Sequence, residues 1–147
     1  AFGRSFTKED ADDIGVEYCS EISEVLNSSD FVSVHLPFTE DTRNIISTPE
    51  LALMKPKAVI INMARGGVLD ESALAAAIAE GRIAGAGDVF EHEPTQLGEE
   101  IRSPLAELKS FQGTHHIGGN TQQAQKAVGE AVLSILERHF SSADRLG

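Results

Sequence analysis

Short apolar runs alternate along the chain with stretches of helical spacing. Two of the runs, residues 31–36 (FVSVHL) and 58–63 (AVIINM), are rich in β-branched side chains, which is typical of buried strands. Residues 84–90 and 111–117 are weaker strand candidates, because the first is rich in glycine and the second carries two histidines. We predict four strands, the last two mainly from their spacing along the chain.

Helical segments with recognisable ends lie between and after these strands. We predict helices over residues 21–26, 49–54, 71–80 and 121–140. Their expected N-caps are Ser20, Thr48 (followed by Pro49), Asp70 and Thr121. In the longest segment, residues 121–140, apolar side chains recur at helical spacing from Ala124 to Leu136. Gly81 is expected to end the helix over residues 71–80.

Strands that alternate with helices pair in parallel through crossover connections, so we predict an α/β fold with an open sheet. In such sheets ligands bind off the carboxyl ends of the strands. Four segments follow the predicted strand ends and should gather at one edge, namely residues 35–39, 62–67, 88–94 and 115–121. Residues 91–109 show no strong periodicity and are expected to form a long loop, which in a compact domain is often functional.

Composition narrows the classes of ligand and location. A formal net charge of -11 without any Lys/Arg cluster argues against nucleic acid and anionic membranes as partners, and favours a small molecule. Cys19 is the single cysteine, so no intrachain disulfide can form, and a reducing cytoplasm is expected. The apolar runs are shorter than the roughly 20 residues that span a bilayer, so no membrane association is expected.

The predicted edge of the sheet brings together side chains suited to proton transfer. They are the guanidinium of Arg65, the carboxylates of Asp88, Glu91 and Glu93, and the imidazoles of His35, His115 and His116. Neither a serine nucleophile elbow nor a Cys/His pair accompanies them. This inventory favours proton and hydride chemistry over acyl transfer.

Reduction of a 2-oxo acid would use three of these side chains. Arg65 can bind a carboxylate through a two-pronged contact, and His116 can protonate a carbonyl oxygen near neutral pH. Glu93 beside His116 would favour the imidazolium form. No side chain can donate hydride, so this chemistry requires a cofactor.

Each of these residues also has a simpler interpretation. Arg65 precedes two glycines and could be a turn residue paired with a surface acid, and His116 could be a packed or solvated histidine. Asn62 could contact a cofactor or serve as a strand-end amide, and Thr121 could contact a cofactor or serve as a helix cap. Residues 91–93 (EHE) could bind a metal, but contiguous loop residues rarely converge on one ion, and no metal is expected.

Longer motifs resemble one family, the D-isomer-specific 2-hydroxyacid dehydrogenases, and within it the 3-phosphoglycerate dehydrogenase branch. The motifs are VHLP at 34–37, LMKP at 53–56, INMARGGVLDE at 61–71, GRIAGA at 81–86, DVFEHEP at 88–94 and HIGG at 116–119. They occur in the family's order, and the similarity runs over residues 14–140. The resemblance implies a Rossmann-like parallel sheet flanked by helices, a homodimer, and a small 2-hydroxy or 2-oxo acid as substrate.

The resemblance also assigns roles to particular residues. Arg65, Glu93 and His116 match the family's catalytic arginine, glutamate and histidine, and Asp88 matches the residue that binds the nicotinamide carboxamide. Further residues implied in binding NAD or NADP are His35, Leu36, Pro37, Thr42, Asn62, Met63, Ala64, His116, Gly118 and Gly119.

The chain departs from the family pattern in several places. It has no G-x-G-x-x-G sequence, and the strand that ends in the ribose-binding acid is missing, so residues 1–147 are expected to form an N-terminally incomplete dinucleotide-binding domain without the family's substrate-binding domain. His115 replaces a usual proline and Gly87 a usual aliphatic residue. The alternatives are a non-catalytic, NAD-responsive module that resembles a corepressor, or a truncated chain with neither activity.

Overall fold

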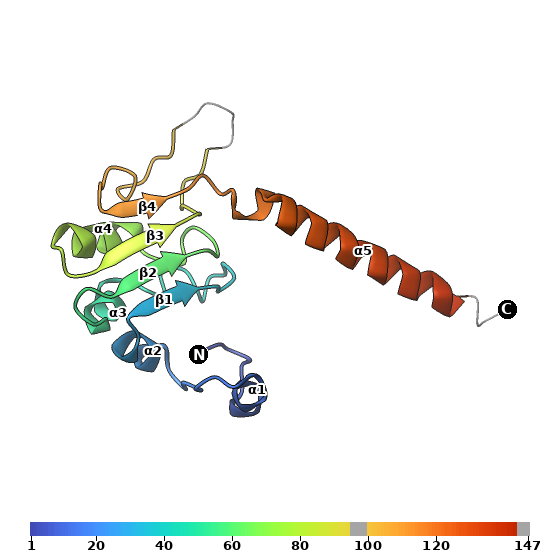
Figure 1. Ribbon diagram of the computed structural model, residues 1–147. Coiled ribbons are helices and arrows are strands. Elements are labelled where there is room, and N and C mark those ends of the chain that lie inside the picture. Colours follow the sequence, from blue (N-terminus) through green and yellow to red (C-terminus); the bar gives the residue numbers. More distant parts are fainter. Residues whose placement is uncertain (95–99, 144–147) are drawn as a thin grey trace. The chain divides into compact units, whose positions relative to one another are not determined.

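The computed structural model describes residues 1–94 and 100–143. The chain forms two compact units, residues 1–115 and residues 116–147. The first unit is built on a four-stranded parallel sheet with the strand order β1-β2-β3-β4 (Figure 1). The strands are β1 (Phe31–Val34), β2 (Val59–Asn62), β3 (Ala84–Gly87) and β4 (Phe111–Gly113). The α/β class and the parallel pairing predicted from the sequence are therefore confirmed.

One face of the sheet carries the hydrophobic core. Val32 is in register with Ile60, Ile60 with Gly85, and Gly85 with Phe111, and all four are buried. The alternate positions point to the other face, where Phe31 is 72% exposed and Val59 and Ala84 are only partly covered. This alternation follows from the two-residue period of a strand.

Four helices belong to the first unit. They are α1 (Lys8–Ile14), α2 (Ile22–Ser28), α3 (Thr48–Leu53) and α4 (Glu71–Ala79). Helix α2 packs on α3, α3 packs on α4, and α4 contacts β3, so these three helices form one continuous layer. Asp70 caps α4 as predicted, because its carboxylate accepts a hydrogen bond of 2.9 Å from the backbone N–H of Ala73.

Two predicted caps were wrong and one helix was not predicted. Ser20 does not cap α2, since it donates its backbone N–H and its hydroxyl to Glu24 instead. Helix α3 is capped by Ser47, whose backbone N–H donates to Glu50 at 2.9 Å, and not by Thr48. Helix α1 escaped prediction because its signal is a polar capping box at its start and not an apolar period.

The observed strands β3 and β4 are shorter than predicted. The third strand was predicted to continue to residue 90, but the chain leaves the sheet after Gly87, and β4 ends at Gly113 before the two histidines. The described parts of residues 91–109 contain neither helix nor strand, which agrees with the predicted loop, whereas residues 95–99 lie outside the described residues.

The second unit contains a short 3-10 turn, η1 (Gly118–Asn120), and helix α5 (Gln122–Ala143). The hydroxyl of Thr121 accepts a hydrogen bond of 3.1 Å from the N–H of Ala124, so both this helix and its predicted cap are confirmed. Across residues 1–94 and 100–143, no helix combines the length and the apolar character that a membrane crossing would need.

Candidate functional site

The carboxyl ends of the four strands lie in a row, and backbone hydrogen bonds extend the sheet into the loops that follow. The bonds run from Met63 N to Val34 O (3.4 Å), from Asp88 N to Asn62 O (3.1 Å) and from Thr114 N to Gly87 O (3.0 Å). The segments that begin at residues 35, 62 and 88 therefore start side by side at one edge of the sheet, as the sequence predicted, and Thr114 lies beside them. Residues 116–121 of the predicted fourth segment belong to the second unit.

The loop after β2 presents Arg65 and is held by the amide of Asn62. This amide donates to the carbonyl oxygen of Arg65 at 3.0 Å and accepts from the N–H of Ala64 at 3.1 Å. Asn62 is buried, whereas the Arg65 side chain is exposed and donates to the carbonyl of Ala64 at 2.7 Å. The amide of Asn62 thus shapes the turn that presents the guanidinium, in line with the simpler of its two interpretations.

Two glycines let this loop contact its neighbours closely. A Cβ atom on Gly66 would lie 2.0 Å from the carbonyl oxygen of Phe90, so only glycine fits against the Phe90–Glu91 peptide. Gly67 has a φ of +78°, and a Cβ there would lie 2.8 Å from the ring of Phe38. The Arg65 loop is therefore packed against both the segment that leads to Glu93 and the loop after β1.

The loop after β1 is held internally by Thr42. Its hydroxyl donates to the carbonyl of Pro37 at 2.6 Å and accepts from the N–H of Thr39 at 2.8 Å. Arg43 follows it, with its guanidinium 4.8 Å from the centre of the Phe38 ring and 4.0 Å from the carboxylate of Glu91. This cation therefore links the loop after β1 to the loop after β3.

Other residues expected to bind the cofactor lie at the ends of β1 and β2. His35 is exposed, and its Nε2 lies 2.7 Å from the hydroxyl of Ser33. Met63 is 45% exposed and Leu36 is half-buried, so apolar atoms are accessible at these strand ends. Ala64 is buried within its turn.

At the end of β3, Asp88 is 4% exposed, and one of its carboxylate oxygens accepts a hydrogen bond of 2.5 Å from the hydroxyl of Thr114. Sequence reasoning missed Thr114, although a hydroxyl that precedes two histidines at a strand end could have been a signal. Glu93 is half-buried, and its Oε1 accepts a hydrogen bond of 3.0 Å from the N–H of Phe90. The loop after β3 therefore turns back, so that the side chain of Glu93 binds the backbone at Phe90.

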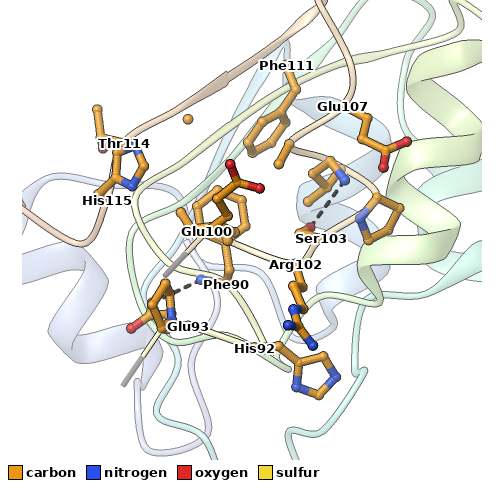
Figure 2. Close-up of a pocket in the computed structure, with 16 residues that line it drawn as sticks. Phe90, His92, Glu93, Glu100, Arg102, Ser103, Glu107, Phe111, Thr114 and His115 are labelled. Atoms are coloured by element: carbon orange, nitrogen blue, oxygen red, sulfur yellow. Dashed lines mark hydrogen bonds between the residues drawn. The ribbon is translucent and has the colours of Figure 1, made fainter. Parts of the chain in front are cut away.

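A hollow of about 1210 Å³ lies beside Glu93, on the β4 side of this edge. Its wall includes the rings of Phe90 and Phe111, which meet edge to face with centres 6.1 Å apart. Figure 2 shows Glu93 and His115 toward one side of the hollow, and His92 and Arg102 toward another. Of the side chains predicted to gather at this edge, Glu93 and His115 line the hollow, and of the three predicted catalytic residues only Glu93 does so within the described part of the chain.

The remaining predicted residues belong to the second unit. His116 has a φ of +53°, a left-handed conformation that is uncommon for a residue with a side chain. Gly118 and Gly119 lie in η1, and the carbonyl of Gly119 accepts a hydrogen bond of 2.8 Å from the side chain of Gln125. The fold therefore brings together the segments of Arg65, Asp88 and Glu93 within the first unit, while His116 follows directly after that unit ends.

The side chains at this edge are chemically compatible with a nicotinamide dinucleotide. Accessible apolar atoms of Met63 suit an aromatic ring, and the buried carboxylate of Asp88 can accept a hydrogen bond from a carboxamide. Among residues 1–94 and 100–143, no three His, Cys, Asp or Glu side chains are grouped so that they could hold a metal ion.

Comparison with known proteins gives a consistent result. The family described as D-isomer specific 2-hydroxyacid dehydrogenase, NAD binding domain, matches residues 1–118. A D-3-phosphoglycerate dehydrogenase of Methanocaldococcus jannaschii is 44% identical over 132 residues, which are 89% of this chain and 24% of that relative. The chain thus spans about a quarter of the length of this relative.

Two solved structures are also similar. A D-lactate dehydrogenase from Aquifex aeolicus, complexed with NAD and lactic acid, has a TM-score of 0.73 and 28% identity, with 94% of this chain and 45% of that chain covered. A D-isomer specific 2-hydroxyacid dehydrogenase from Xanthobacter autotrophicus Py2, in complex with NADPH and MES, has a TM-score of 0.57 and 38% identity, with 65% of this chain and 30% of that chain covered.

Proposed function

Because the chain belongs to the D-isomer specific 2-hydroxyacid dehydrogenase family through its NAD-binding domain, we propose that the protein interconverts a D-2-hydroxy acid and the matching 2-oxo acid. One observation supports this proposal above the others. Gly66 lies against the Phe90–Glu91 peptide, so the loop that presents Arg65 and the segment that carries Glu93 are in direct contact. The proposed substrate-binding arginine and the glutamate proposed to orient His116 are thus carried by adjacent segments.

In this proposal Arg65 binds the substrate carboxylate and orients its carbonyl group. The exposed guanidinium donates one hydrogen bond to the Ala64 carbonyl, and a guanidinium has five N–H donors, enough for a two-pronged contact besides. Lysine has no such planar pair of donors, so an arginine suits the proposed contact better.

His116 acts as the proton donor in the reducing direction and as the proton acceptor in the oxidising direction. The bound dinucleotide supplies or accepts the hydride, and the proton that His116 gives to the carbonyl oxygen completes the hydroxyl group. Glu93 orients the imidazole, because its carboxylate can accept a hydrogen bond from a ring N–H. The left-handed backbone of His116 costs about 1 kcal/mol, which is consistent with a site that holds this side chain in one orientation.

The proposed dinucleotide site follows the carboxyl edge of the sheet. Asp88 would bind the carboxamide, and the other residues would be His35, Leu36, Pro37, Thr42, Asn62, Met63, Ala64, Gly118 and Gly119. The internal bonds of Thr42 and Asn62 indicate that these two shape the loops and contribute to binding mainly through them. Similar structures hold NAD in one case and NADPH in another, so the proposal covers both carriers. The expected homodimer stays a prediction.

The test uses the protein as its gene encodes it, with NADH or NADPH oxidation measured against a panel of 2-oxo acids. We expect turnover in the wild type, and Arg65→Gln or His116→Ala should lower kcat/KM by about 100-fold to 10,000-fold without abolishing binding of the reduced dinucleotide. Arg4→Gln is the matched control, since Arg4 is exposed and pairs only with Asp41 among the described ion pairs.

Wild-type-like turnover in the Arg65 variant would overturn the proposal. Firm dinucleotide binding without turnover by the wild type on any acid of the panel would instead support the NAD-responsive binding module.

A further inference from the structure

Helix α4 begins with a buried carboxylate, Glu71, which is 8% exposed. A glutamate at this position is favourable near the N–H groups of the first turn, but that interaction does not require burial. Asp70, which caps the same helix, is only half-buried. The burial of Glu71 therefore has to be explained by what its two oxygen atoms bind.

Both oxygens of Glu71 accept hydrogen bonds from the loop after β3. Oε1 accepts from the backbone N–H of Glu91 at 2.6 Å, and Oε2 accepts from the hydroxyl of Ser103 at 2.5 Å. Ser103 is itself buried, and its hydroxyl accepts from the N–H of Leu105 at 3.2 Å, where Leu105 belongs to the core. One carboxylate thus joins two separate stretches of this loop to the start of α4.

The Phe90–Glu91 peptide is held from a second side by Gly66, whose Cα lies so close that a Cβ would collide with the Phe90 carbonyl. Gly66 and Glu71 both belong to the short stretch between Arg65 and the first turn of α4. The peptide that precedes Glu93 is therefore held between two points of the same segment that presents Arg65.

We propose that Glu71 is a positioning residue for the reaction. Its carboxylate fixes the segment of Glu93 against the loop of Arg65 and so sets the separation of the two groups. This inference rests on the proposed function, which assigns Glu93 to orienting His116. Stability alone does not explain a carboxylate at this position, because a buried charge is costly and apolar side chains of similar volume often give equal stability. The directed hydrogen bonds of Glu71 to the loop after β3 do explain it.

The main test compares Glu71→Ala with Glu71→Gln in the protein as its gene encodes it. The alanine variant loses both acceptors. The glutamine variant can still accept from Glu91 N with its amide oxygen and can donate to the hydroxyl of Ser103, so it should restore most of the function. Asp70→Ala is the matched control, since it also weakens the start of α4 but removes a bond to Ala73 and none to the loop after β3.

Hydrogen exchange and steady-state kinetics give two independent measurements of the effect. Hydrogen exchange at the backbone N–H of Glu91 should become at least about 10-fold faster in Glu71→Ala and remain slow in Asp70→Ala. In steady-state kinetics, Glu71→Ala should lower kcat by about 100-fold with an unchanged Kd for NADH, the effect that a displacement of roughly 1 Å has on reacting groups.

A double variant separates positioning from general destabilisation. If Glu71 acts through Glu93, adding Glu71→Ala to Glu93→Gln should cause no further loss of kcat. A further loss as large as in the single variant would overturn the inference, and so would an equal loss of kcat in Asp70→Ala. An unchanged rate of hydrogen exchange at Glu91 N–H in Glu71→Ala would show that the hydrogen bond to Glu71 does not hold this segment, and would also overturn the inference. Failure of the proposed function would appear separately, as full activity of the Arg65→Gln variant.

Discussion

Gly66→Ala tests the contact on which the candidate site depends. The added Cβ would lie 2.0 Å from the Phe90 carbonyl oxygen and 2.5 Å from the Glu91 nitrogen, whereas ordinary Cβ contacts begin near 3.4 Å. Both colliding partners are backbone, so neither can turn aside as a side chain would. The two segments would have to part by at least about 1 Å.

The expected cost follows from this displacement. Overpacking typically costs about 1 to 3 kcal/mol, and we place Gly66→Ala at the upper end because the hydrogen bond from Glu91 N to Glu71 is strained as well. For a domain of this size, about 3 kcal/mol lowers Tm by roughly 6 to 12 °C. If the proposed function holds, the same shift should lower kcat by about 100-fold.

The assays are thermal unfolding followed by circular dichroism, and NADH oxidation under saturating substrate. Gly129→Ala is the matched control, because it adds the same methyl group inside helix α5, where no atom apart from the adjacent backbone of the helix lies within 4 Å. Alanine is favoured over glycine in helices by about 0.5 to 1 kcal/mol, so this control should be neutral or stabilising. A Gly66→Ala protein with unchanged Tm and unchanged kcat would refute the close approach of the two segments.

Three further predictions concern hydrogen bonds made by individual side chains. Asn62→Asp turns a donor into an acceptor opposite a carbonyl and should cost about 1 to 3 kcal/mol in urea unfolding; equal stability would contradict it. Thr114→Val removes the hydroxyl that donates to Asp88 and should cost a similar amount, whereas Thr114→Ser should restore stability. The backbone and side-chain hydrogen bonds from Ser47 lower the pKa of Glu50, so their stabilisation is present above the ordinary pKa of 4.5 and is lost as the pH falls below it. Glu50→Gln should therefore lose less stability than the wild type between about pH 5 and pH 3, and parallel curves would disprove this.

Much of the architecture could be predicted from local pattern. The β-branched runs at residues 31–36 and 58–63 became β1 and β2, and the cap at Asp70 was confirmed. Both signals depend on residues that are neighbours in the chain. The cap of α3 was predicted one residue too late, because Ser47 and Thr48 are equally good caps and only the position of Glu50 decides between them.

That the segments after β1, β2 and β3 gather at one edge of the sheet could also be predicted, because parallel pairing places the carboxyl ends of the strands together. What could not be predicted is which backbone atoms touch there. No sequence pattern shows that Gly66 faces the Phe90 carbonyl, or that Thr114 donates to Asp88, since these contacts join residues that are distant in the chain.

The sequence by itself determined the element types, the parallel sheet and the residue types available at its edge, since local propensity and period depend only on nearby positions. Tertiary structure decided which of those residues are exposed and which are internal supports. Asn62 and Thr42 are residue types that often bind ligands, but here their side chains form hydrogen bonds inside their own loops. Glu71 is a residue type that is usually exposed at the start of a helix, but here it is buried. Burial and partner choice depend on how distant segments pack, and that information is not present in any short stretch of the chain.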